Sequence, residues 1–128
     1  MSPVKILMID DEKMFCELVK MNLELSGKFE VYIANDGKEG VRVARGLLPK
    51  LILLDVIMPK QDGFETLAIL KGDSRTMSIP VIMLSALTDE KSAEKASSLY
   101  SQYYIAKPIS TVKLIEKIEQ VLGLIDKE

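Results

Sequence analysis

Five polar residues follow directly on short apolar runs of the 128-residue sequence: Asp10, Asp11, Asp55, Ser85 and Lys107. Three carboxylates brought within about 4–5 Å of one another repel by several kcal/mol per pair near a protein surface. Raised pKa values, the Lys107 ammonium or a hard divalent cation can relieve that repulsion. An all-oxygen set in a sequence without histidine suits Mg²⁺ better than zinc or copper. A magnesium site of this kind beside a lysine and a serine indicates phosphoryl transfer, with a carboxylate as the nucleophile.

The apolar runs themselves predict how these residues are positioned. They alternate with stretches of helical length, a pattern typical of an α/β fold with a parallel sheet covered on both faces. Residues 29–33 include polar positions and are expected at a sheet edge. The carboxyl ends of parallel strands share one edge, so the polar residues are expected to form a single site there. The five expected strands are residues 4–9, 31–34, 51–54, 81–84 and 103–106.

Five helices are expected between and after these strands. The first is indicated by Met14, Leu18, Met21 and Leu25 at helical spacing, with Gly27 placed to end it. The second starts at the cap Asp36, and its internal Gly40 should weaken it by up to about 1 kcal/mol relative to alanine. The others start after Asp62-Gly63, after Thr88 and at the cap Ser110, the last with Leu114, Ile118, Val121 and Leu122 turned inward.

Composition excludes several classes of protein. Seventeen basic against nineteen acidic residues give a net charge of −2, so direct nucleic-acid binding is not expected. No apolar run approaches the roughly 18 residues of a membrane span, and the N-terminus lacks a signal-peptide core. The one cysteine, Cys16, cannot form an internal disulfide, and it and the seven methionines are expected to fill core space. We therefore expect a soluble, cytoplasmic protein with one domain over residues 1–128.

Four blocks of the sequence resemble the receiver domain of response regulators in two-component signalling, and the match covers nearly the whole chain. The resemblance implies a flavodoxin-like α/β fold with strand order 2-1-3-4-5 and helices on both faces. The blocks are the pair Asp10-Asp11, residues 53–63 (LLDVIMPKQDG), residues 80–86 (PVIMLSA) and residues 104–108 (YIAKP).

By this resemblance, Asp55 matches the phosphoacceptor, which takes a phosphoryl group from a histidine kinase or phosphotransfer protein. The absence of histidine in the chain agrees with an external donor. Asp11, Asp55 and the backbone carbonyl of Ile57 would ligate Mg²⁺, with Asp10 acting mainly through bound water. Lys107 matches the lysine that pairs first with the acceptor and then with its phosphate.

The resemblance also implies a conformational switch. Ser85 stands where the family has serine or threonine, and Tyr104 where it has a switch aromatic. Phosphorylation would shift a population between two conformations, with Ser85 moving toward the phosphate and the aromatic side chain turning inward. The output face would be the fourth helix, fifth strand and fifth helix, including Tyr100 and Tyr103. It would dock a downstream target or output domain, or a second copy of the phosphorylated chain.

The sequence departs from the family pattern at a few positions. Many receivers have glycine where Tyr100 stands, and small or acidic residues where Gln102 and Tyr103 stand. Ile57 and Leu87 flank the acceptor in the family's arrangement, and neither side chain can orient an attacking water. We therefore expect slow self-dephosphorylation.

Other interpretations stay open. The chain could be a magnesium-dependent phosphohydrolase that forms an aspartyl-phosphate, although the common hydrolase motif has a second aspartate where Ile57 stands. It could be a receiver-like interaction domain that takes no phosphate, or a receiver excised from a longer kinase or regulator. Taken singly, Asp10-Asp11 could cap the first helix, and Lys107 could be a solvated lysine.

Overall fold

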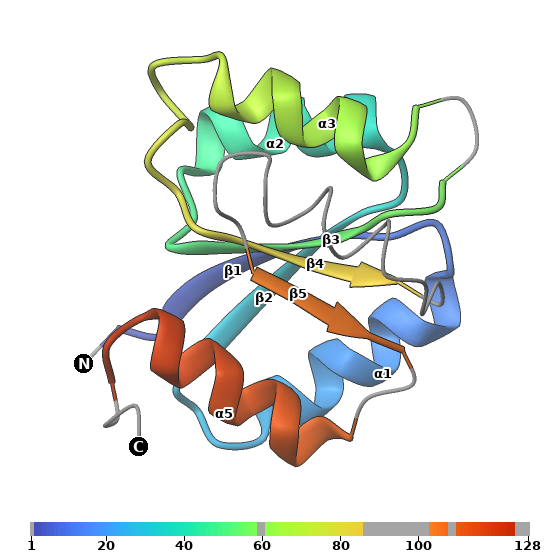
Figure 1. Cartoon of the computed structure of the whole chain (residues 1–128). Helices are drawn as coiled ribbons and strands as arrows, with labels where there is room; N and C mark the ends of the chain where they lie inside the picture. The colour runs from blue at the N-terminus through green and yellow to red at the C-terminus, as the bar shows by residue number, and fades with distance from the viewer. Residues whose placement is uncertain (1, 59–60, 86–102, 108–109, 125–128) are drawn as a thin grey trace.

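Figure 1 shows a computed structural model of the chain, in which a parallel sheet is sandwiched between two layers of helices. The structure describes residues 2–58, 61–85, 103–107 and 110–124, except the side chain of Ser85. The fourth helix, expected after Thr88, lies outside this part, as do Leu87, Tyr100 and Gln102. The elements are β1 (Val4–Ile9), α1 (Lys13–Glu24), β2 (Phe29–Ala34), α2 (Gly37–Leu47), β3 (Leu51–Asp55), α3 (Gly63–Lys71), β4 (Val81–Ser85), β5 (Tyr103–Ala106) and α5 (Thr111–Val121).

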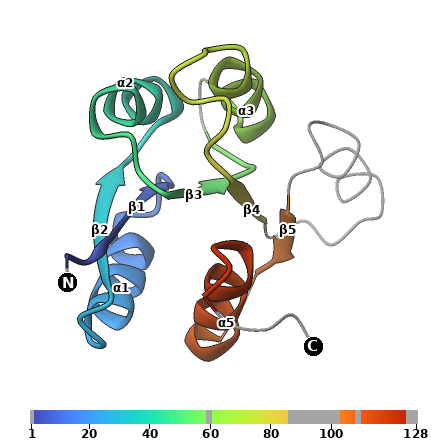
Figure 2. The same cartoon turned by 90° about the vertical axis from the view of Figure 1, so that its left-hand side faces the viewer.

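The five strands are parallel in the order β2-β1-β3-β4-β5, which confirms the predicted flavodoxin-like α/β fold. Helices α1 and α5 cover one face of the sheet, and α2 and α3 cover the other (Figure 2). In the described part of the chain, no helix combines the length and apolarity that crossing a bilayer requires.

The three central strands are apolar because both of their faces are buried. Alternate side chains of each strand point to opposite faces, which divides the core into two clusters. Leu7, Ile52 and Leu54 pack in the cluster that also holds residues of α2 and α3. Met8, Leu51 and Leu53 pack in the cluster that also holds residues of α1 and α5.

The strand boundaries differ slightly from those expected. The edge strand β2 begins at Phe29 rather than at residue 31, and its position at the sheet edge is confirmed. The strands β3 and β4 each include one more residue than expected, Asp55 and Ser85. The added residues keep their place in the ladder, because Asp55 pairs with Leu84 and Ser85 pairs with Ala106.

The apolar residues whose spacing predicted helix α1 are not the residues that face the core. The residues that face the core are Cys16, Val19 and Leu23. The spacing that predicted the helix belongs to an exposed stripe, hereafter the α1 stripe, whose side chains are 52–88% exposed. The α1 stripe consists of Met14, Leu18, Met21 and Leu25.

The predicted helix caps are confirmed. Asp36 accepts a hydrogen bond from the Glu39 amide, and Ser110 accepts one from the Lys113 amide. Asp62 caps α3 in a reciprocal capping box with Glu65. Helix α1 ends before Gly27, whose φ of +75° is a left-handed conformation that favours glycine. The inward side of α5 is also as expected, with Leu114 and Ile118 buried and Val121 and Leu122 packed on the core.

An ion pair from α1 covers the free edge of β2. The Glu24 carboxylate accepts a hydrogen bond from the Val31 amide (2.9 Å), and the Lys20 ammonium donates one to the Val31 carbonyl (2.8 Å). Lys20 and Glu24 also pair with each other at 2.9 Å. Unpaired backbone amide and carbonyl groups at a sheet edge can pair with a strand of another chain. This ion pair occupies both backbone groups of Val31, so another strand cannot pair with β2 at that residue.

Gly40 has a packing role that corrects the expectation from helix propensity. A Cβ atom at Gly40 would lie 2.7 Å from the Ile9 Cγ1 atom, with the Ile9 Cδ1 atom closer still. Ile9 is fully buried at the end of β1, so it has little room to move away. The glycine therefore lets α2 approach the sheet. Alanine at this position would not stabilise the protein as helix propensity predicts, because its methyl group would clash with Ile9.

Gly40→Ala should destabilise the fold by about 1–3 kcal/mol, because the added methyl group overpacks the contact between α2 and β1. Gly46→Ala is the matched control in the same helix, since a Cβ atom there meets nothing within 4 Å. The control should stabilise the fold by a few tenths to about 1 kcal/mol through helix propensity. Urea unfolding measures both changes, and an equal gain from both substitutions would contradict the packing role of Gly40.

Candidate functional site

The strand register places the predicted polar residues along one edge of the sheet. Ile9 pairs with Leu54, so Asp10 lies next to Asp55 at the carboxyl ends of β1 and β3. Asp55 pairs with Leu84, and Ser85 pairs with Ala106, the residue before Lys107. The strand order reverses between β1 and β3, which is where open α/β sheets bind ligands.

Asp10 is fully buried and its two carboxylate oxygens have different partners. Oδ1 accepts a hydrogen bond from the Glu12 amide (2.9 Å), and Oδ2 accepts one from the Lys107 ammonium (2.9 Å). Burial raises the pKa of Asp10, although these two hydrogen bonds act in the opposite direction. Glu12, rather than Asp10 or Asp11, occupies the N-cap position of α1, so capping this helix is not the role of the aspartate pair.

Asp55 is the last residue of β3 and is 4% exposed. Burial and, next, the charge of Asp10 raise the pKa of Asp55 to about 6, while Lys107 acts to lower it. The Lys107 Nζ atom lies 3.4 Å from Asp55 Oδ1. Two buried carboxylates thus share one nearby ammonium, which leaves the site short of positive charge.

Lys107 is the positive centre of the site, and only 12% of its side chain is exposed. Burial alone would lower the pKa of Lys107, but the hydrogen bond and charge of Asp10, the hydrogen bond to Glu12 and the charge of Asp55 raise it above its usual value. The ammonium also lies 4.5 Å from the centre of the Phe15 ring. Lys107 is therefore a charged residue of the site whose side chain is mostly shielded from solvent, which corrects the interpretation of a solvated lysine.

Gly63 brings the start of α3 against the backbone that carries Asp55. The Gly63 amide donates a hydrogen bond to the Val56 carbonyl at 2.8 Å. A Cβ atom at Gly63 would lie 2.7 Å from the Val56 Cα atom and closer still to the Asp55 carbonyl oxygen. A glycine at this position allows that close approach.

The carboxylates can hold a metal ion. Asp10, Asp11 and Asp55 each offer one oxygen, and these three atoms lie within 4.8 Å of one another. Asp10 and Asp55 are buried, whereas Asp11 is in contact with solvent. The all-oxygen donors and the excess of negative charge fit Mg²⁺, which keeps several waters when carboxylates bind it.

The remaining predicted residues are placed as follows. Ile57 lies two residues after Asp55 with a side chain that is 52% exposed, and the metal-binding role of its carbonyl stays a prediction. The backbone of Ser85 ends β4 beside the site, while its side chain lies outside the described part. Tyr104 on β5 packs against the cluster under α2 and α3, and Tyr103 packs on the opposite face.

Sequence reasoning missed three neighbours of the site. Glu12 Oε1 accepts a hydrogen bond from Lys107 at 3.1 Å, Phe15 lies under the same ammonium, and Asn35 donates a hydrogen bond to the Asp10 carbonyl at 3.0 Å. In the sequence, Glu12 and Phe15 lie a few residues after Asp10, and Asn35 directly follows β2. That position was the one signal that could have indicated them, and it is weak without knowledge of the tertiary contacts.

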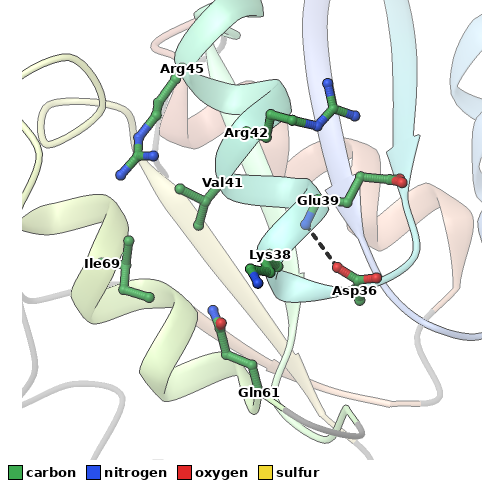
Figure 3. Close-up of a pocket in the computed structure, with 8 residues that line it drawn as sticks. All are labelled: Asp36, Lys38, Glu39, Val41, Arg42, Arg45, Gln61 and Ile69. Atoms are coloured by element: carbon green, nitrogen blue, oxygen red, sulfur yellow. Dashed lines mark hydrogen bonds between the residues drawn. The ribbon is translucent and has the colours of Figure 1, made fainter.

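A groove between α2 and α3 has a volume of about 660 Å³ (Figure 3). Arg45 in its wall is held by Asp73 at 2.8 Å. Among the residues that the structure describes, the groove shares no lining residue with the acidic site. Its lining residues are Asp36, Lys38, Glu39, Val41, Arg42, Arg45, Gln61 and Ile69.

Comparison with known proteins identifies the family of this arrangement. The family model described as the response regulator receiver domain matches residues 6–119. A CheY-like receiver domain protein from Methanospirillum hungatei has a similar structure, with a TM-score of 0.87 and 27% sequence identity. The match covers 96% of each chain.

Two curated relatives are transcriptional regulators. The DNA-binding dual master transcriptional regulator RpaA of Synechocystis is 36% identical over 96% of this chain and 51% of its own length. The alkaline phosphatase synthesis transcriptional regulatory protein PhoP of Bacillus subtilis is 35% identical over 92% of this chain and 48% of its own length. The chain thus spans about half the length of these relatives.

Asp55→Asn should stabilise the metal-free protein at pH 7 by about 1–3 kcal/mol. The folded protein keeps a proton on Asp55 up to a pKa of about 6, whereas the ordinary value is 3.8. The folded state therefore binds more protons between about pH 4 and 6, so stability falls as the pH rises through that window and the loss persists above it. Urea unfolding in EDTA should show the gain at pH 7 and almost none at pH 4. A gain of equal size at both pH values would contradict the buried-charge explanation.

Proposed function

Because the chain belongs to the response-regulator receiver family, we propose that it is a signalling switch that accepts a phosphoryl group on Asp55. The donor is a histidine kinase or a phosphotransfer protein. The observation that supports this most directly is the buried Asp55 carboxylate, which lies 3.4 Å from Lys107 and next to Asp10 at the switch point of the sheet. A nucleophilic carboxylate, a cation-binding acidic pair and an ammonium are the groups that phosphoryl transfer needs.

The transfer requires no redox step or added base. An oxygen of the ionised Asp55 carboxylate forms a bond to phosphorus as the bond from phosphorus to the donor nitrogen breaks. The electron pair of the broken bond leaves with the donor imidazole. Asp55 must be ionised for this attack, and its raised pKa indicates that the metal-free site disfavours that state.

The residues present would hold Mg²⁺ through the carboxylates of Asp11 and Asp55 and the carbonyl of Ile57, with Asp10 acting through water. When bound, the ion supplies positive charge that favours ionised Asp55 and neutralises phosphoryl oxygens. Lys107 binds the carboxylate before transfer and the new phosphoryl oxygens after it. Its partnership with Asp10 at 2.9 Å keeps the ammonium charged and near the acceptor.

The output of the switch would involve Ser85, Tyr104 and the face formed by the fourth helix, β5 and α5. Ser85 would bond to a phosphoryl oxygen, and Tyr104 on the neighbouring strand would respond by turning inward. On the same strand, the Tyr103 ring lies 5.1 Å from the Lys117 ammonium, which ties β5 to α5. A downstream protein, an output domain or a second copy of the chain would bind this face.

The domain acts alone or as one part of a longer regulator. The two named relatives are about twice the length of the matched region, and one is described as DNA-binding. The net charge of −2 argues against direct nucleic-acid binding by this domain itself. A single cysteine, Cys16, which is buried and free, agrees with a cytoplasmic location.

We expect acetyl phosphate and Mg²⁺ to label the purified protein once, on Asp55, as measured by intact-protein mass spectrometry. Asp55→Asn should abolish the label, and EDTA should prevent it. Lys107→Gln should slow labelling at least several-fold without unfolding the protein, since Lys107 assists the reaction but is not the nucleophile.

Two outcomes would contradict the proposal in different ways. Continuous release of phosphate over many turnovers would favour the phosphohydrolase alternative. An unmodified wild-type protein that binds no Mg²⁺ would favour a receiver-like interaction domain that takes no phosphate.

The phosphorylated protein should lose its phosphate slowly, because the half-exposed Ile57 side chain beside Asp55 cannot orient an attacking water. Ile57→Asn supplies an amide that can do so and should shorten the lifetime several-fold. The lifetime is measured by mass spectrometry after removal of acetyl phosphate, with Ile69→Asn as the control at a more distant, 41% exposed isoleucine on α3. Rapid loss from the wild type that Ile57→Asn leaves unchanged would contradict this expectation.

A further inference from the structure

The ammonium of Lys107 is held by more groups than the receiver reaction itself requires. It lies 2.9 Å from Asp10 Oδ2, 3.1 Å from Glu12 Oε1 and 3.4 Å from Asp55 Oδ1. The Phe15 ring lies 4.5 Å away, within the range of a cation–π contact. Of the three carboxylates, the phosphoacceptor is the most distant.

Glu12 is an unusual residue for the position it occupies. It is the N-cap of α1, where a short side chain such as Ser or Asp ordinarily accepts a hydrogen bond from the helix. The Glu12 side chain makes no such capping bond, and its carboxylate binds Lys107 instead. The backbone of Glu12 is held separately, by the bond from its amide to Asp10.

Phe15 lies on the same first turn of α1 and completes the surroundings of the ammonium. It is half-buried and packs against the core cluster under α1 and α5. The start of α1 thus places one carboxylate and one aromatic ring beside a lysine that is 95 residues from Glu12 in the sequence.

In the proposed function, Lys107 binds the Asp55 carboxylate and then the phosphoryl oxygens. Its contacts with Glu12 and Phe15 compete with that binding. A phosphoryl group on Asp55 adds strong acceptor oxygens, and the ammonium must turn toward them. An ammonium has three hydrogens to donate. While Asp10 and Glu12 each accept one, a single hydrogen is left for Asp55 or its phosphate.

We propose that Glu12 is a positioning residue: with Phe15 it holds the Lys107 ammonium in a resting position closer to Asp10 and Glu12 than to Asp55, and it releases the ammonium when Asp55 is phosphorylated. This inference rests on the proposed function. The pair joins a mostly buried lysine to a 63% exposed carboxylate, so its effect is a modest one. Loss of the Glu12 charge should speed labelling of Asp55 by acetyl phosphate about two- to fivefold.

The experiment is a double-mutant cycle between Glu12→Gln and Lys107→Gln, with labelling by acetyl phosphate and Mg²⁺ followed by mass spectrometry. Glu12→Gln should speed labelling of the otherwise wild-type protein and have no effect when Lys107 is already glutamine. The control is Glu17→Gln, which removes the same charge from an exposed position on α1 and should leave the rate within about 1.5-fold.

A direct measurement accompanies the cycle. The nitrogen resonance of the Lys107 side chain, observed by NMR in the metal-free protein, should shift in Glu12→Gln and stay unchanged in Glu17→Gln. This readout follows the position of the ammonium and does not depend on phosphorylation.

The outcomes separate the inference from the function on which it rests. Equal acceleration by Glu12→Gln with and without Lys107 would show a general field effect and overturn the positioning role. An unchanged rate and an unchanged Lys107 resonance, with normal labelling of Asp55 in the wild type, would overturn the inference alone. Failure of the wild type to label at all would instead overturn the proposed function, and the inference with it.

Discussion

The contact between one ammonium and a group of carboxylates at the sheet edge is the interaction on which the site depends. Lys107 lies within 3.4 Å of carboxylate oxygens of Asp10, Glu12 and Asp55. One positive charge cannot neutralise three negative ones, and Asp11 adds a fourth nearby. Asp10 and Asp55 are buried, so their negative charge is costly. The burial of Asp55 and the charge of Asp10 raise the pKa of Asp55, and the excess of negative charge favours binding of a cation.

The fold brings this charge together through backbone pairing. The parallel register places Asp10 beside Asp55, and the ladders through β4 and β5 bring Lys107 to the same edge. Close contacts at Gly40 and Gly63 let the helices of one layer approach the ends of β1 and β3. The residues around the site are therefore held by a densely packed frame, and the polar groups have little freedom to separate.

Helix α1 connects the core, the site and the surface. Its inner side packs Val19 and Leu23 on the sheet, its first turn holds Lys107 through Phe15, and its outer side exposes the α1 stripe. The thiol of Cys16 donates a hydrogen bond to the Asp10 carbonyl, and burial raises the pKa of that thiol to about 12. The cysteine is thus an inert part of the frame under Asp10, as expected of a core-filling residue.

The sequence alone determined the α/β class, the order of the elements and the location of the acidic site. Apolar runs show which strands are buried on both faces, and residues such as Asp10 and Asp55, at the ends of those runs, must meet at the common edge of a parallel sheet. The resemblance in four blocks then indicated the receiver family, which the family model confirms. These features were predictable because periodicity and strand-end position are local properties of the chain.

Only the tertiary structure decided which side of α1 faces the core, since both the α1 stripe and the set Cys16, Val19 and Leu23 have helical spacing. It also reversed the expectation for Gly40, where the neighbour that excludes a side chain is Ile9 on another element. The contact of Glu12 with Lys107 joins residues 95 positions apart, and no local pattern encodes it. The physical reason is the same in each case: these outcomes depend on distances between atoms of different elements, which exist only once the helices are packed on the sheet.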